Sequence, residues 1–118
     1  MFAVHAVPDP QTGDQVMAAV ELRAGQTFDP VAFATFLAAQ ADLGTKWTPR
    51  FVRVVDDMPL TANNKVNKQP LRAAAWITTD PVWWQPRRGD AYRLLTDADR
   101  AALAAEFASH DRTHLLPR

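Results

Sequence analysis

The chain has 118 residues, which is enough for one compact domain with a genuine core and does not require a second. Its 13 basic and 13 acidic residues cancel, which argues against a general attraction to nucleic acid or to an anionic membrane. Cysteine is absent, so disulfides and thiolate metal sites are excluded, and with neither a leader pattern nor a bilayer-length apolar run we expect a soluble, cytoplasmic protein.

The first part of the chain predicts a pair of strands followed by a helix. Apolar runs at Phe2–Val7 and Val16–Leu22 are separated by a short acidic loop with proline and glycine, which is the pattern of two sheet strands. Asp29 and Pro30 form a helix start, because aspartate caps the first N–H groups and proline fits the first helical position. The helix should end by Gly44. Its predicted inner side carries Val31, Phe33, Phe36, Leu37 and Gln40, of which Phe33, Phe36 and Leu37 are assigned to the core.

The middle of the chain predicts a strand, a loop and a short helix. Arg50–Val55 is rich in apolar and β-branched residues and indicates a strand. Residues 56–72 follow it as an exposed polar segment that carries two of the chain's three lysines. Functional residues are concentrated in loops of this kind. Pro70–Ala75 is predicted to form a short helix that begins at the proline.

The last third mixes weak signals with one clear helix. Trp76–Thr79 has some extended character, and Pro81–Asp90 is the one linker-like stretch. Tyr92–Leu95 predicts a final short strand. Thr96 and the aspartate three residues later have the spacing of a capping box, so a helix should run from there to about Ala108. Strands and helices alternate irregularly, which indicates the α+β class, with a small mixed sheet flanked by helices.

Within the exposed loop, a turn precedes the first of its two lysines. Pro59 restricts the backbone at the entry, and Asn63 and Asn64 tolerate left-handed conformations at a small cost. Such a turn can hold Lys65 outward in one orientation. Considered without any relative, Lys65 is most simply an ordinary solvated lysine, because lysine is nearly always exposed.

The segment Pro59-Leu60-Thr61-Ala62-Asn63-Asn64-Lys65 resembles the last conserved motif of the adenylate-forming acyl-CoA synthetases, Pro-x-Thr-x-x-Gly-Lys. Asn64 stands where most members have glycine, and asparagine is the next most permissive residue for a positive φ. Residues 7–15 (V-P-D-P-Q-T-G-D-Q) and 45–52 (T-K-W-T-P-R-F-V) resemble two further motifs of the family, in the same order. Three ordered motifs across roughly residues 2–76 are more specific than any one of them.

The resemblance implies the C-terminal lid domain of these enzymes, without the hairpin with which that domain begins in the family. We divide the chain into a domain core, residues 1–77, and a C-terminal extension, residues 78–118, that is part of the same domain. The D-P-V-W-W-Q-P and A-Y-R-L-L-T segments of the extension resemble the end of the very-long-chain and fatty-acid-transport branch.

The reaction that the resemblance implies joins a fatty acid to CoA. The carboxylate attacks the α-phosphate of ATP to give acyl-adenylate and pyrophosphate, the CoA thiol then displaces AMP, and Mg²⁺ enters with the ATP. Lys65 is the candidate catalytic residue, because a cation can bridge the carboxylate and the α-phosphate as they meet. Pro59, Thr61 and Asn64 are the motif positions that shape its loop. The implied partner is an N-terminal adenylating domain, in cis or in trans, and the isolated chain should be inactive.

Three other basic residues are weaker candidates for phosphate contacts. Lys46 stands where the family often has lysine, but packing of its stem on Trp47 is the simpler explanation. Lys68 and Arg72 lie on one turn of the predicted helix and are explained equally well as solvated charges.

The sequence does not indicate the length of the acyl chain, because the acid pocket would belong to the adenylating domain. Peripheral attachment to a membrane is left open beside the cytoplasmic location.

No metal site is predicted. Asp56 and Asp57 lack a clustered third ligand, so a role in the turn is preferred. His110 and His114 have the i, i+4 spacing of a helical metal pair, but they lie near the chain end with one acid nearby and are predicted to be exposed. His5 lies in a predicted strand and is assigned a structural role.

Trp76, Trp83 and Trp84 give an unusual aromatic density between prolines. They either cover the sheet or face a partner, and covering is preferred.

Two alternatives to an enzyme part stay open. One is a non-catalytic binding module that uses these tryptophans on a protein partner. The other is a truncated remnant whose missing hairpin leaves a sheet edge unpaired.

Overall fold

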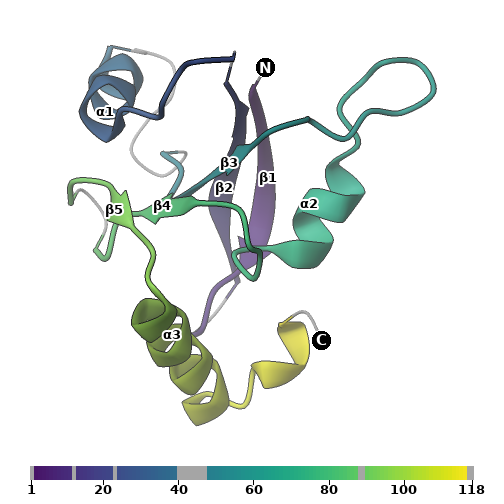
Figure 1. Ribbon diagram of the computed structural model, residues 1–118. Coiled ribbons are helices and arrows are strands. Elements are labelled where there is room, and N and C mark those ends of the chain that lie inside the picture. Colours follow the sequence, from purple (N-terminus) through teal and green to yellow (C-terminus); the bar gives the residue numbers. More distant parts are fainter. Residues whose placement is uncertain (1, 12, 23, 40–47, 88–89, 117–118) are drawn as a thin grey trace.

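The computed structural model describes residues 2–11, 13–22, 24–39, 48–87 and 90–116. Its centre is a five-stranded sheet with strand order β1-β2-β3-β4-β5. All neighbouring pairs are antiparallel except β2 and β3, which are parallel. Helices flank this mixed sheet (Figure 1), so the predicted α+β class is confirmed.

The strands and helices follow the order β1, β2, α1, β3, α2, β4, β5, α3 and a final 3₁₀ turn. The strands are β1 (Phe2–Pro8), β2 (Asp14–Glu21), β3 (Phe51–Val55), β4 (Val82–Trp84) and β5 (Arg93–Leu94). The helices are α1 (Pro30–Ala38), α2 (Lys68–Ala74), α3 (Asp97–Ser109) and the 3₁₀ turn η2 (Thr113–Leu115). Because β2 and β3 are parallel, the chain must cross over between them, and α1 lies in that connection.

Two of the three predicted helix starts are confirmed. The Asp29 carboxylate accepts hydrogen bonds from the backbone N–H groups of Val31 and Ala32 at 3.0 and 3.1 Å. Thr96 and Asp99 form the reciprocal capping box at the start of α3, with bonds of 3.0 and 3.1 Å. The described part of α1 ends at Ala38, and the predicted stop at Gly44, like Gln40, lies outside the described residues.

The predicted inner side of α1 is partly wrong. Leu37 is buried and Phe33 is half-buried, but the side chains of Val31 and Phe36 are 72% and 57% exposed. Consecutive helical residues are separated by about 100°, so Phe36 points well away from the side on which Phe33 and Leu37 meet the sheet. Of the predicted inner residues that are described, only Phe33 and Leu37 therefore pack against the core.

The boundaries around α2 and β4 also differ from prediction. The helix begins at Lys68, two residues before Pro70, because the Asn67 side chain accepts a bond from the N–H of Gln69. Pro70 is tolerated there since the first turn needs no donor from it. The expected extended segment Trp76–Thr79 forms no strand. Instead, Val82–Trp84 pairs with β3 inside the stretch predicted as a linker, where backbone bonds to an open sheet edge outweigh the flanking prolines.

The main core joins the beginning and the end of the chain. One cluster combines Val7, Met17 and Phe51 of the first three strands with residues from the second half of the chain, which are Ala75, Trp76, Val82, Trp84, Leu95, Leu103 and Phe107. The rings of Phe51 and Trp84 stack with centroids 6.0 Å apart. The preference for tryptophans that cover the sheet is confirmed for Trp76 and Trp84, which are buried, while Trp83 is half-buried beside Phe28.

We expect the 78–118 segment to unfold together with the rest of the domain, because Phe107 is fully buried against Trp76 and the strands. Phe107→Ala should lower the free energy of unfolding by about 3–5 kcal/mol while keeping a single transition. Urea unfolding followed by tryptophan fluorescence measures both quantities. Leu115→Ala is the control, because this side chain is 38% exposed and should lose little. A separate early transition for the C-terminal segment in the Phe107 variant would contradict this expectation.

Candidate functional site

The predicted loop with its lysine is a narrow, hydrogen-bonded projection between β3 and α2. Leu60 and Val66 form an isolated antiparallel bridge. At the base, the N–H of Asn67 donates to the carbonyl of Pro59 at 2.8 Å. Figure 1 shows the loop standing clear of the sheet beyond the end of β3. It is therefore closed at both ends like a small hairpin.

The tip of the loop is held by Thr61. Its N–H donates to the carbonyl of Lys65 at 2.7 Å, and its hydroxyl accepts from the N–H of Lys65 at 3.3 Å. Its carbonyl accepts from the N–H of Asn64 at 2.9 Å. Asn64 has φ of 61°, so the expected left-handed residue is confirmed at this position. Lys65 is exposed, as predicted, and its backbone groups are held by Thr61.

Beneath the tip, the loop and α2 are anchored by apolar burial. Met58 and Leu71 are 5% and 2% exposed and pack in one cluster with Ala3, Ala19 and Val55. The N–H of Met58 also donates to the carboxylate of Glu21 on β2. The projecting turn is thus mounted on the sheet, which restricts where the Lys65 side chain can reach.

The other predicted cations fall in different places. Lys68 begins α2 and Arg72 lies one turn later, so the two share a side of the helix, and both are exposed. Within the described part of the chain, no salt bridge involves Lys65, Lys68 or Arg72. Lys46, with its neighbour Trp47, lies outside the described residues.

His5 is buried in β1, the strand against which α2 packs. It is 4% exposed in β1, and neither ring nitrogen has a hydrogen-bond partner in the described structure. Burial, helped by the positive charges of Arg72, Lys68 and Arg53, lowers the pKa of His5 to about 4. The imidazole is therefore neutral at physiological pH, which agrees with a structural role.

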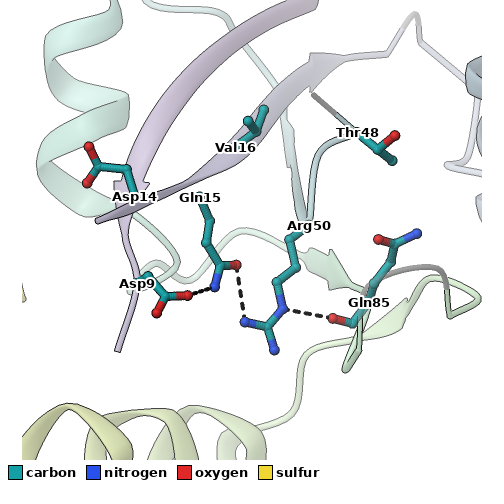
Figure 2. Close-up of a pocket in the computed structure, with 7 residues that line it drawn as sticks. All are labelled: Asp9, Asp14, Gln15, Val16, Thr48, Arg50 and Gln85. Carbon is teal, nitrogen blue, oxygen red and sulfur yellow. Dashed lines mark hydrogen bonds between the residues drawn. The ribbon is translucent and has the colours of Figure 1, made fainter. Parts of the chain in front are cut away.

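A second candidate site is a pocket of about 250 Å³ at the far end of β2 from the loop's anchor (Figure 2). It is lined by Asp9, Asp14, Gln15, Val16, Thr48, Arg50 and Gln85. The guanidinium of Arg50 donates to the carbonyls of Gln85 and Pro86 at 3.0 and 2.8 Å and to the Gln15 side chain at 3.1 Å. It also lies 5.2 Å from the ring centroid of Trp84.

Arg50 is a residue that the sequence reasoning missed. Its three bonds connect the start of β3 to the β4 segment and to β2, so its first effect is to hold the C-terminal segment against the sheet. Gln15 in turn donates to the carboxylate of Asp9. An arginine directly before an apolar strand was the available signal, but its partners lie 35 residues away on either side in sequence. The pocket is a structural junction, and Lys65 is not one of the residues that line it.

The residues considered for metal binding do not converge. Asp56 and Asp57 are exposed bends after β3, and His110 and His114 are exposed, as predicted. His110 caps α3 and His114 lies in η2, so they do not share a helix. Among the described residues, no group of three or more His, Asp or Glu side chains is placed to hold a metal ion. None of the described helices combines the length and apolar character needed to span a bilayer.

Residues 2–65 match the family described as "AMP-binding enzyme C-terminal domain". The chain is 51% identical over 114 residues to a steroid-22-oyl-CoA synthetase of Rhodococcus jostii, a match that covers 96% of this chain and 20% of the relative. It is 49% identical over 81 residues to the medium/long-chain-fatty-acid–CoA ligase FadD17 of Mycobacterium marinum and of Mycobacterium tuberculosis, covering 69% of this chain and 16% of each relative. The chain thus spans about a fifth or less of the relatives' length. No solved structure shows a significant match.

The buried imidazole predicts that the domain loses stability in weak acid. The unfolded chain takes up a proton at His5 near pH 6.5, whereas the folded chain does so only near pH 4, so lowering the pH through this window favours unfolding. The loss should be about 2–4 kcal/mol. Urea unfolding at several pH values measures it. His5→Leu should flatten this dependence, and His110→Gln, at an exposed position, should leave it intact. Equal pH dependence in the His5 variant and the parent would contradict the assignment.

Proposed function

This chain belongs to the AMP-binding enzyme C-terminal domain family, and we propose that it is the lid of a fatty-acid–CoA ligase in which Lys65 assists adenylation. The observation that carries the proposal is the exposed Lys65 at the tip of a closed, hydrogen-bonded loop. Curated relatives that are named as CoA synthetases and ligases support the reaction class.

The proposed step has a clear need for a cation. An oxygen of the fatty-acid carboxylate bonds to the α-phosphorus of ATP, the bond to pyrophosphate breaks, and two negatively charged groups must approach one another. An ammonium group beside both of them stabilises the charge that gathers in the transition state, most of all where water is excluded. In the second step the CoA sulfur attacks the acyl carbon and AMP leaves. Mg²⁺ would arrive bound to ATP and would neutralise the phosphates.

The loop geometry suits such a cation. Both backbone groups of Lys65 are held by Thr61, and the bridge between Leu60 and Val66 closes the loop behind it. A fixed Cα leaves only the side-chain torsions to be ordered when the ammonium meets its target, which lowers the entropic cost of positioning. Thr61 and Asn64 are on this view positioning residues, and Pro59 contributes its carbonyl to the base.

Lys68 and Arg72 are secondary candidates for phosphate contacts. Both are exposed, lie on one side of α2 and have no salt bridge in the described structure. We propose that they strengthen binding of the phosphates from further away and that Lys65 alone reaches the reacting groups. Lys46 remains a candidate for a phosphate contact on the basis of the family resemblance alone.

The chain requires a companion to react. A relative's length is about five times the part that this chain covers, and we propose that the remainder includes the adenylating domain that binds ATP, the fatty acid and CoA. The lid would close over that domain for adenylation and move away for thioester formation. We propose that the complex lies in the cytoplasm, and we expect the isolated chain to be inactive.

Removing the Lys65 ammonium tests the assigned role. In a complete ligase that carries this C-terminal segment, Lys65→Ala should slow acyl-adenylate formation, measured as pyrophosphate release, by about 10²–10³-fold. Thioester formation from supplied acyl-adenylate should change by no more than a few-fold. Lys68→Ala is the matched control and should slow pyrophosphate release by less than about tenfold. Unchanged pyrophosphate release in the Lys65 variant would show that this lysine does not act in adenylation.

A further inference from the structure

The outer edge of β1 is open. In the described structure β1 lies at one end of the sheet and pairs only with β2, from Phe2↔Val20 to Pro8↔Asp14. The opposite edge strand, β5, has only two residues and includes Arg93. By contrast, Phe2–Val7 is a straight run with no charged residue at neutral pH, and only Pro8 at its end lacks a donor. Natural edge strands are usually protected by charge, proline or shortness.

The register shows which backbone groups face outward. The N–H of Asp9 donates to the carbonyl of Gly13 at 3.0 Å, and the carbonyl of Val16 accepts from Arg50 on the β3 side at 2.9 Å. Since hydrogen-bonded positions alternate along an antiparallel pair, the odd-numbered residues of β1 bond to β2. The N–H and C=O groups of Val4 and Ala6 therefore point to the open edge.

The two faces beside this edge differ in chemistry. Val4 is 37% exposed and Ala6 is exposed on the face away from α2, so that face is apolar. On the other face, α2 packs against β1. Lys68 and Arg72 lie near enough to His5 for their positive charges to lower its pKa. Both cations are exposed and without a salt bridge in the described part of the chain, and His5 has two unpartnered ring nitrogens. The edge thus combines open hydrogen-bonding groups with unpaired positive charge on one side.

We propose that the β1 edge binds an extended segment of a separate protein in which apolar and acidic residues alternate, so that the segment adds a strand to the sheet. Antiparallel addition places apolar residues opposite Val4 and Ala6, where the backbone bonds form. It places an acidic residue opposite His5, at a position without backbone bonds, where side chains approach most closely. That carboxylate meets the charges of Lys68 and Arg72. Main-chain bonds supply affinity and charge supplies selectivity in such strand addition.

A labelled peptide tests the proposal directly. The probe has valine and glutamate alternating over about seven residues, from valine to valine, with glycine and serine at both ends, and its binding to the 118-residue chain is followed by fluorescence anisotropy at low salt. We expect at least tenfold weaker binding when lysine replaces glutamate, and a similar loss in Arg72→Gln. N-methylation of the valine nitrogens should abolish binding, whereas N-methylation of the glutamate nitrogens, which face away from β1, should not.

Each other outcome overturns the proposal. Equal binding of the glutamate and lysine peptides would remove the charge argument, and indifference to the site of N-methylation would remove the strand pairing. Sedimentation of the chain alone provides a further check. If it forms a dimer that Ala6→Pro converts to a folded monomer, the edge is occupied by a second copy and not by an acidic partner.

Discussion

The Thr61–Lys65 pairing fixes the backbone of the loop tip while Lys65 stays exposed, and the proposed role of this lysine depends on that constraint. The Thr61 N–H and hydroxyl hold the two backbone groups of Lys65, and the left-handed Asn64 turns the chain back so that these groups meet. Behind the tip, burial of Met58 and Leu71 fixes the loop to the sheet. Lys65 is therefore displayed at the exposed tip, and no salt bridge among the described residues involves its ammonium.

The C-terminal segment supports this arrangement on the same face of the sheet, at the other end of the strands, where Val7, Met17 and Phe51 meet it. β4 pairs with β3, the strand that leads into the loop, and Arg50 fastens the β3 start to the β4 segment. Phe107 and Trp76 complete the main core, and Arg112 donates to the backbone of Asp9 and Gly13 at 2.9 and 3.2 Å. The family match ends at residue 65, but β4 and part of the core that packs on Phe51 come from residues beyond it.

Local signals in the sequence were sufficient for much of the fold. The caps at Asp29 and Thr96, the first hairpin and the positive φ at Asn64 depend on residues close in sequence, and each was predicted. Apart from the start of α2, which the neighbouring Asn67 cap sets, the errors concern distant partners. Val82–Trp84 becomes a strand only because β3 offers an open edge, and Phe36 is exposed because the sheet reaches only one side of α1. The Arg50 junction was invisible for the same reason, since its partners come together only after folding.

The most direct measurement is complementation in trans. An adenylating domain from a full-length relative, truncated before the segment that matches this chain, is mixed with the 118-residue chain, and fatty-acid-dependent ATP–pyrophosphate exchange is recorded. We predict that the parent chain raises the exchange rate by about 100-fold and that an equally folded Lys65→Ala chain does not. Equal stimulation by the two chains would contradict the central claim that this displayed ammonium serves the adenylation step.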